Sequence, residues 1–526
     1  MLYSKINASA ATLSKNRTED SIVPASGMCV TCVDGCIGMC EIGKSAYRGV
    51  EMLYPKPYGI ISAASEKKYP IDLSHFTILG SCRNAYGMEA DSDKALFTKV
   101  NLEKKIGHDK SIKLKLPIVI AGLGSTWIAN ANWEGLAVGA ALSGIIVTIG
   151  ENVGGMDPTT QLENGKIVYS KELENRVKLF QEWQQDGYGG IVVQANVEDT
   201  RLGVHEYALN KLNVDIVELK WGQGAKNIGG EVKIKDLEKA QTLKDRGYIV
   251  LPDPYDPLVI EAFRNHIFDE FERHSRLGML SEEDFYSRVD ELRAAGAKYI
   301  FLKTGAYRPV DLALAVKCAS EAKIDFLTVD AAGGGTGMSP WRMMNEWGIP
   351  RVELWSLLYN YLGRLASKGR YIPDVAVASG ITMEDQIFKA LALGAPYFKA
   401  VGMARAPLAA AMVGKNIGKK IENDEAPVYI ARFGNKRDEI FVTSPELRRR
   451  FGDKFDLIPS GALGLYTYMT RLEQGLKQLM CGARKFSLDY LNRNDIASLT
   501  RECTELSGIT YIMECDKEEV DKLLDD

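Results

Sequence analysis

Four cysteine residues, Cys29, Cys32, Cys36 and Cys40, lie within a stretch of twelve residues near the start of the chain. Four thiolates this close together are the ligand set of a 4Fe–4S cluster. A four-cysteine zinc site more often uses two separated pairs. The spacing therefore favours an iron–sulfur cluster, with a zinc ion or a group of simple thiols as the alternatives.

Glycine-containing segments follow three apolar runs in the second half of the chain: Gly333–Gly337, Ser379–Gly380 and Gly402–Ala404. Backbone amides without a side chain in the way can bind a phosphate group where a helix begins. In a barrel of alternating strands and helices, the loops after the last two strands are the usual phosphate site. Together the three segments predict a cofactor that carries a phosphate.

Two lysines, Lys220 and Lys303, lie at the ends of predicted strands. Side chains alternate along a strand, so a residue at its tip can point into the mouth of a barrel. A cation there would stabilise the reduced ring of a flavin. The alternative is that each lysine simply leaves its strand for solvent.

From residue 116 onward, apolar runs typical of buried parallel strands alternate with amphipathic helical segments. Such an alternation forms either a closed (β/α)₈ TIM barrel or an open doubly wound sheet. We predict the barrel, because glycine-containing segments follow nearly every strand at the end where a barrel has its active site. One strand candidate is in excess, and we assign 247–253 as accessory because a long insertion follows it. The candidates are 116–122, 143–150, 189–195, 214–220, 247–253, 297–305, 324–332, 374–381 and 395–402.

The same reading divides the chain into an N-terminal arm (1–27), a cysteine-rich iron–sulfur domain (28–110), the α/β barrel (111–420) and a C-terminal helical cap (421–526). A net charge of −4 gives no basic field for nucleic acid or an anionic membrane. We find neither a signal peptide nor an apolar run long enough to span a membrane. The expectation is a cytoplasmic protein, and nine cysteines, an odd number, agree with a reducing compartment.

Several motifs then resemble one family. QGAK at 223–226 with Gly229–Gly230, TVDAAGGGTGMSP at 328–340, TIGENVGG at 148–155, TRLGV at 200–204 and ALALGAPYFKAVGMA at 390–404 occur in the order of the FMN-binding glutamate synthase family. The resemblance covers about residues 112–410. It implies an FMN-dependent oxidoreductase acting on CH–NH₂ donors, which reduces a 2-imino acid, formed from 2-oxoglutarate and ammonia or an amine, to an amino acid, or runs the reverse. Ferredoxin or an electron-transfer subunit would be the redox partner, and a homo-oligomer is compatible with it.

The resemblance also implies roles for individual residues. Glu151, Lys226 and Lys303 would be catalytic, and Arg201 and Gln223 would bind the substrate. An arginine fork and a lysine suit a substrate with two carboxylates, and a glutamate can donate a proton. The residues implied to contact FMN are Ala121, Gly122, Thr148, Gln194, Lys303, Asp330, Gly334, Gly335, Ser379, Gly380, Gly402 and Met403.

The chain departs from the family pattern in several places. The QGAK loop lacks a proline and is one residue shorter, the loop after Glu151 is two residues longer, and Gly333 stands where the family has an acid. No cysteine loop follows the last predicted strand, and no cysteine occupies position two, as glutamine-hydrolysing relatives require. The departures keep two alternatives open: an FMN-barrel reductase or isomerase of another small acid, or an electron-transfer subunit of a larger complex.

Overall fold

The computed structural model describes residues 35–38, 41–48, 69–185, 187–224, 228–278, 281–334 and 347–525. Cys29, Cys32, Cys40, Lys226 and Gly335 lie outside the described residues, as does the arm predicted for 1–27.

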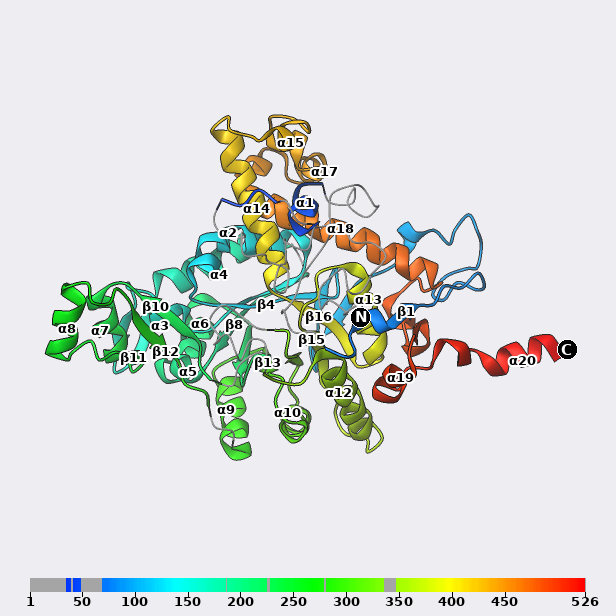
Figure 1. The fold of residues 1–526 in the computed structure, drawn as a ribbon, viewed down its shortest axis with the longest axis horizontal. Helices are drawn as coiled ribbons and strands as arrows, with labels where there is room; N and C mark the ends of the chain where they lie inside the picture. Colours follow the sequence, from blue (N-terminus) through cyan, green and yellow to red (C-terminus); the bar gives the residue numbers. More distant parts are fainter. Residues whose placement is uncertain are drawn as a thin grey trace.

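Eight parallel strands close into a barrel at the centre of the molecule (Figure 1). The barrel closes where β16 pairs with β4, with Val401 opposite Ile118. The predicted TIM barrel is confirmed, and the open sheet is excluded. The run at 247–253 forms strand β11 (Ile249–Leu251) outside the barrel, as predicted. The barrel strands are β4 (Ile118–Leu123), β5 (Ile146–Ile149), β8 (Gly190–Ala195), β9 (Ile216–Lys220), β13 (Tyr299–Thr304), β14 (Phe326–Asp330), β15 (Asp374–Ala378) and β16 (Phe398–Met403).

Helices connect consecutive strands around the outside of the barrel. Ser281 is the N-cap of α9, since its hydroxyl accepts the N–H of Asp284 at 3.1 Å. Met383 is the N-cap of α13, and the preceding Thr382 donates to the Gln386 side chain. The helices are α2 (Trp127–Ser143), α3 (Val153–Met156), α4 (Lys171–Gln181), α5 (Val197–Leu202), α6 (Val204–Leu212), α9 (Glu282–Ala294), α10 (Pro309–Glu321), α12 (Arg351–Ala366), α13 (Glu384–Gly394) and α14 (Arg405–Glu422).

A hairpin closes the amino-terminal end of the barrel. Strands β2 (Lys104–Ile106) and β3 (Ile112–Leu114) pack their apolar side chains against the lowest layer of the barrel interior. The turn between them is fixed because Gly107 donates its N–H to Asp374 Oδ2 at 3.0 Å, at the start of β15. The barrel is therefore open at its carboxyl end only, where TIM barrels have their active sites.

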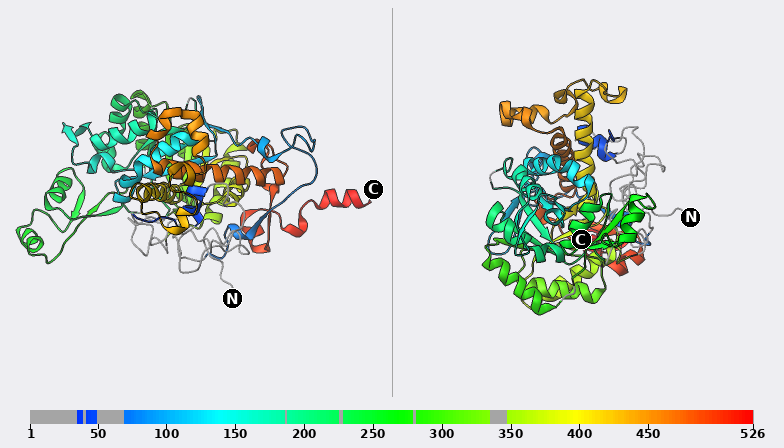
Figure 2. Two further views of the ribbon diagram at one scale, coloured as in Figure 1. Left: turned by 90° about the horizontal axis from the view of Figure 1, so that it is seen from above. Right: turned by 90° about the vertical axis from the view of Figure 1, so that its left-hand side faces the viewer.

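An insertion between β9 and α9 extends away from the barrel (Figures 1 and 2). It consists of an antiparallel sheet of β10 (Glu231–Ile234), β12 (Phe271–His274) and β11, with helices α7 (Leu237–Asp245) and α8 (Pro257–Arg264). Its core, which includes Tyr248 and Phe271, also contains Met156 of α3, the short helix that follows β5. The insertion is thus attached to the loop that carries Glu151.

The C-terminal region wraps the side of the barrel and pairs with an N-terminal segment. Strand β1 (Phe76–Ile78) pairs antiparallel with β17 (Ile496–Ser498), and α18 (Ser460–Gly482) packs against α2, α14 and α1 (Glu41–Arg48). The division into a cysteine-rich domain and a cap stays a prediction. None of the helices in the described ranges has the length and hydropathy needed to cross a membrane. The smaller elements are β6 (Gln161–Glu163), β7 (Lys166–Tyr169), α15 (Val428–Ala431), α16 (Arg437–Ile440), α17 (Ser444–Phe451), α19 (Arg501–Ser507) and α20 (Lys517–Asp525).

Glycines allow α14 and α18 to cross at short range, and this contact gives a first prediction. A Cβ at Gly464 would lie 2.6 Å from the carbonyl oxygen of Ala410 and 2.8 Å from the Cα of Gly414. We expect Gly464→Ala to lower the free energy of unfolding by about 1–3 kcal/mol, because backbone atoms must move apart. Gly482→Ala in the same helix is the control, since its Cβ meets nothing within 4 Å. Urea unfolding measures both, and equal stability of the two variants would contradict the packing argument.

Candidate active site at the carboxyl end of the barrel

A mostly polar layer lies directly above the apolar interior of the barrel. The apolar layer includes one inward residue from each strand, such as Val192 on β8 and Ile216 on β9. Two residues further along, each strand turns a side chain inward again. The bulge in β4 places Ala121 and Gly122 at the same level. The other seven strands contribute Thr148, Gln194, Glu218, Lys303, Thr328, Ala378 and Gly402.

The charges of this layer centre on Lys303. Its side chain is 4 % exposed, and its ammonium group interacts with the buried carboxylates of Glu218 and Asp330. Burial raises the pKa of both carboxyl groups, and the positive charge of Lys303 opposes that rise. Gln194 donates its side-chain N–H to Glu218. Three side chains of this layer, together with Asp330 two residues beyond Thr328 on β14, thus form one electrostatic unit, which we call the polar floor: Gln194, Glu218, Lys303 and Asp330.

Above the floor, three side chains meet at the rim of the barrel. Lys220, two residues beyond Glu218 on β9, forms an ion pair with Glu151 and donates to Gln223 Oε1 at 3.2 Å. A small cavity of about 30 Å³, lined by these three residues and by Tyr307, opens beside them. That volume is about the share of one water molecule in the liquid. The rim therefore offers a cation, a carboxylate and an amide to a small polar ligand.

Asp330 fixes the two loops that flank this cavity. Its Oδ2 accepts the N–H of Gly224 at 3.0 Å, in the QGAK loop. A Cβ at Gly334 would lie 1.9 Å from Asp330 Oδ1, so this position requires glycine. Gln223 then donates to the carbonyl of Gly334 at 3.3 Å. The contacts hold the β9 and β14 loops together across the barrel mouth.

The glycines after the last two strands form an open backbone surface. Ser379 and Gly380 have positive φ angles of 131° and 62°, and a Cβ at Gly402 would lie 2.8 Å from that of Ala378. Arg405, at the start of α14, donates to the carbonyl of Gly333 at 3.2 Å. Burial lowers the pKa of Arg405 to about 10, which leaves it a cation at neutral pH. Backbone amides, a helix start and a half-buried cation together suit a phosphate group.

Gly333, where the family pattern has an acid, lies close to Ser379. A Cβ at this position would lie 2.4 Å from the hydroxyl oxygen of Ser379. A larger side chain at 333 would therefore require the Ser379 hydroxyl to rotate away.

The structure brings most of the predicted residues together and leaves one apart. The predicted cofactor residues that are described, with Glu151 and Gln223, surround the barrel mouth at the ends of their strands. Arg201 is exposed in the last turn of α5 and is absent from the lining of the rim cavity. Its carbonyl accepts the ammonium group of Lys166 at 2.7 Å.

Sequence reasoning missed Glu218 and Arg405. Alternation along β9 carries the signal for Glu218, because Ile216, Glu218 and Lys220 face the same side of a strand. No local pattern distinguishes Arg405 from any other arginine at a helix start.

A buried polar network supports Glu151 from behind. Asn152, in the left-handed conformation with φ 69°, donates its N–H to Asp199 Oδ2 at 2.7 Å. Its side chain donates to Ser275 Oγ at 3.1 Å and accepts from Tyr248 at 3.2 Å, both in or next to the insertion. The insertion therefore helps to hold the loop that carries Glu151.

Asp199 gives this network a measurable pH dependence. Burial raises its pKa to about 7 from the ordinary value of 3.8. The folded state therefore holds the proton more tightly than the unfolded chain, and stability is lost as the pH rises from about 4 to about 7. We expect Asp199→Asn, which keeps an acceptor for Asn152, to flatten the stability curve over this range. Urea unfolding at a series of pH values tests it; an unchanged slope would show that Asp199 is ionised throughout.

Cys36 is the one predicted cluster ligand among the described residues. It is half-buried, its sulfur accepts the N–H of Gly38 at 3.4 Å, and its carbonyl accepts Asn416 Nδ2 at 2.7 Å. Asn416 belongs to α14, the helix that follows the last barrel strand. Within the described residues no group of three or more His, Cys, Asp and Glu could hold a metal ion, and three of the four predicted ligands lie outside them.

A family model described as the conserved region in glutamate synthase matches residues 57–240 and 273–415. The chain belongs to this family. The gap in the match, 241–272, falls within the insertion, so the barrel and the polar floor lie inside the shared region. The resemblance seen in the sequence motifs is confirmed.

Known proteins agree with this assignment in sequence. A glutamate synthase large subunit-like protein of Rhizobium meliloti is 26% identical over 483 residues, which cover 90% of this chain and 92% of the relative. Among solved structures, a mutant flavocytochrome b2 with pyruvate bound covers 85% of this chain and 81% of its own, at 13% identity and a TM-score of 0.45. A monotopic (S)-mandelate dehydrogenase covers 81% and 88%, at 12% identity and a TM-score of 0.45.

Proposed function

We propose that the chain is an FMN-dependent oxidoreductase that reduces a 2-imino acid, formed from a 2-oxo acid and ammonia or an amine, or runs the reverse. The observation that carries this proposal is the polar floor, with Lys303 at its centre, at the mouth of a glutamate synthase family barrel. It lies between a surface suited to a phosphate and a rim suited to a small acid.

The barrel mouth fits FMN. Gln194 Oε1 is buried without a hydrogen-bond partner among the described residues, and a Cβ at Gly122 would lie 2.8 Å from it. An unpaired acceptor beside a glycine suits the polar edge of a flat ring. Lys303 would hold negative charge on that edge, and Ser379, Gly380, Gly402 and Met403 would hold the phosphate end. When bound, FMN supplies a hydride for the 2-imino carbon.

The rim residues would bind and protonate the substrate. The Lys220 ammonium can bind a substrate carboxylate, and Gln223 can donate to a carboxylate oxygen. Glu151 can hydrogen-bond the imine nitrogen and supply its proton. The family resemblance adds Lys226 and Arg201 to this set as proposed substrate contacts, and for Arg201 this requires its side chain to leave the exposed position that it has in α5.

We also propose a 4Fe–4S cluster on Cys29, Cys32, Cys36 and Cys40, which would pass single electrons from ferredoxin or a partner subunit. The position of Cys36 supports this proposal. Its carbonyl accepts a hydrogen bond from Asn416 of α14, the helix that directly follows the last barrel strand. The family has its cysteine loop after that strand, and here an N-terminal segment packs against the following helix instead.

Two measurements test the proposal. The visible spectrum of anaerobically purified protein should show flavin bands and a broad iron–sulfur shoulder that bleaches on reduction. Enzyme reduced with dithionite, freed of reductant and mixed with 2-oxoglutarate and ammonium should then form glutamate in one turnover. Colourless protein that does not bind added FMN would exclude the flavin. Yellow protein that forms no glutamate would favour a reductase of another small acid or an electron-transfer subunit.

A further inference from the structure

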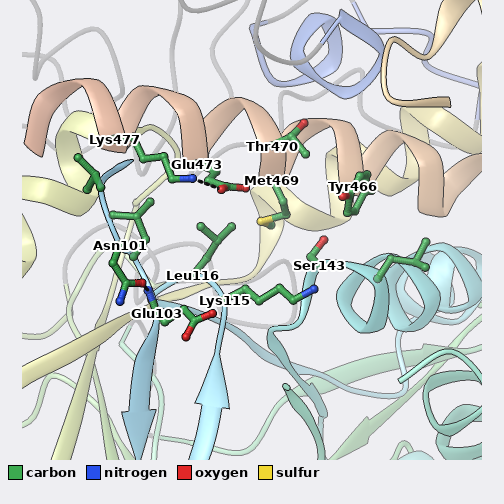
Figure 3. A pocket seen from close by; sticks show the side chains of 13 residues that line it. Asn101, Glu103, Lys115, Leu116, Ser143, Tyr466, Met469, Thr470, Glu473 and Lys477 are labelled. Atoms are coloured by element: carbon green, nitrogen blue, oxygen red, sulfur yellow. Dashed lines mark hydrogen bonds and ion pairs between the residues drawn. The ribbon is translucent and has the colours of Figure 1, made fainter. Parts of the chain in front are cut away.

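A second cavity, of about 200 Å³, lies at the amino-terminal end of the barrel, opposite the candidate active site. It is bounded by the segment before β4, by the end of α2 and by α18 (Figure 3). Its volume equals that of about seven water molecules, which is enough for a small organic ligand. This end of a barrel ordinarily serves stability.

One wall of the cavity carries Glu103 and Lys115. In the β2–β3 hairpin Lys104 lies opposite Leu114. Extending this register by one residue places Glu103 opposite Lys115. They form no ion pair with each other. Glu103 accepts the hydroxyl of Tyr188 at 2.6 Å, and the Lys115 ammonium lies 5.1 Å from the centre of the same ring. Among the described residues no carboxylate lies within ion-pair distance of Lys115.

The opposite wall is a turn of α18. Glu473 and Lys477 form an ion pair of 2.6 Å there, and their side chains are 40% and 22% exposed (Figure 3). Only one oxygen of Glu473 is used in that pair. Each wall therefore has one cation and one carboxylate. Leu116, Leu142 and Met469 add apolar side chains to a lining that is otherwise mostly polar.

Lys115 is the group in this cavity that we expect a bound anion to stabilise. It is half-buried. Burial lowers the pKa of its ammonium group, and so does the nearby Arg450, whereas the charges of Glu473, Glu103 and Glu446 raise it. A partly dehydrated cation with no carboxylate at ion-pair distance is stabilised by an anion placed beside it.

We propose that this cavity binds a free α-amino acid. Its carboxylate would bind Lys115, its ammonium group would bind the second oxygen of Glu473, and its side chain would pack on Leu116, Leu142 and Met469. A ligand that carries both charges matches a lining in which each wall has one cation and one carboxylate. The inference does not depend on the proposed oxidoreductase activity.

The backbone links this cavity to the rest of the barrel. Lys115 donates its N–H to the carbonyl of Gly144 at 3.1 Å, and a Cβ at Gly144 would lie 2.8 Å from the Lys115 side chain. Gly144 ends α2 and precedes β5, whose other end leads to Glu151. A ligand bound here would be an effector, held at one end of the strand whose other end leads to the candidate active site.

Calorimetry on the full chain can test the proposal without turnover. We use a Glu151→Gln, Gln223→Ala background so that the rim does not bind the same ligands. The common L-amino acids, succinate and inorganic phosphate are titrated to about 10 mM, which detects millimolar affinities. At least one amino acid should bind with 1:1 stoichiometry, and Lys115→Met and Glu473→Gln should each weaken it about tenfold or more. Lys113→Met is the matched control, because Lys113 is exposed on the same hairpin.

Three outcomes would overturn the proposal. The first is that no amino acid binds to the Glu151→Gln, Gln223→Ala protein. The second is that succinate and phosphate bind as tightly as any amino acid. The third is that Lys113→Met weakens binding as much as Lys115→Met. If Lys115→Met unfolds, Leu142→Phe replaces it, since a larger side chain at that position should block the cavity. Binding that persists in colourless, inactive protein would separate this site from the proposed function.

Discussion

Protein with Lys303→Met is expected to be purified without bound flavin and to be less stable than the parent by about 3–5 kcal/mol. The variant leaves Glu218 and Asp330 in the barrel without the cation that both of them face. Two buried carboxylates without a counter-charge either stay ionised at high cost or take up protons. Catalysis should fall by at least about a hundredfold, the usual effect of removing one charged donor from a reaction centre.

The pH dependence of this loss identifies its cause. Without Lys303, Glu218 and Asp330 become harder to ionise in the folded state than in the unfolded chain, so stability is lost as the pH rises. The deficit should be larger at about pH 8 than at about pH 5. Lys298→Met is the control, because Lys298, just before β13, pairs with Asp215 at the surface and is 53% exposed; exposed pairs contribute at most about 1 kcal/mol.

A double variant separates stability from cofactor binding. Lys303→Met with Glu218→Gln removes one of the two unpaired charges, and Gln194 keeps a partner at that position. We expect part of the stability to return while flavin content stays low, as measured by urea unfolding and by the absorbance of the purified protein. Full recovery of flavin in the double variant would show that Lys303 serves the fold and not the cofactor.

The sequence predicted the barrel because its strands are continuous apolar runs with glycines at one end. The same apolar content made 247–253 resemble a ninth strand, and only the long segment after it marked it as accessory. Of the polar floor, Asp330 lies in a family motif, Gln194 is implied by the family resemblance, and Lys303 is indicated both by the resemblance and by its place at the end of a strand. Its fourth member, Glu218, belongs to no such motif and follows from the alternation on β9.

Other parts of the site depend on contacts between distant segments, which no local pattern encodes. Asn152 is held by Asp199 and by Ser275, 123 residues further along the chain. Arg405 meets Gly333 from 72 residues away. Neither residue has a repeat or a spacing that marks it. The exposed position of Arg201 in α5 is another such case, since a motif shared with the family does not fix where a helix turns its side chains.

Replacing Glu151 with glutamine should lower the rate of imine reduction by about 10²–10⁴ and leave the flavin content unchanged. Glu151 lies at the rim, where it pairs with Lys220, and takes no part in the polar floor. Glutamine keeps the size and the hydrogen bonds of the side chain and removes its proton. The absorbance of the reduced flavin in a single turnover measures the rate of the chemical step directly. Glu163→Gln is the matched control, because Glu163 lies on the exposed strand β6.

Lys220→Met tests the same pair from its other side. Without the cation, the Glu151 carboxylate is easier to protonate, so the alkaline limb of the pH–rate profile should move to higher pH. The Michaelis constant for the 2-oxo acid should rise as well, because a substrate carboxylate loses its partner. If Glu151 only held Lys220 in place, Glu151→Gln would raise the Michaelis constant and leave the single-turnover rate intact. Three results together would identify Glu151 as the proton donor. The single-turnover rate of Glu151→Gln falls at saturating substrate, the alkaline limb of the pH–rate profile moves in Lys220→Met, and the same limb disappears in Glu151→Gln.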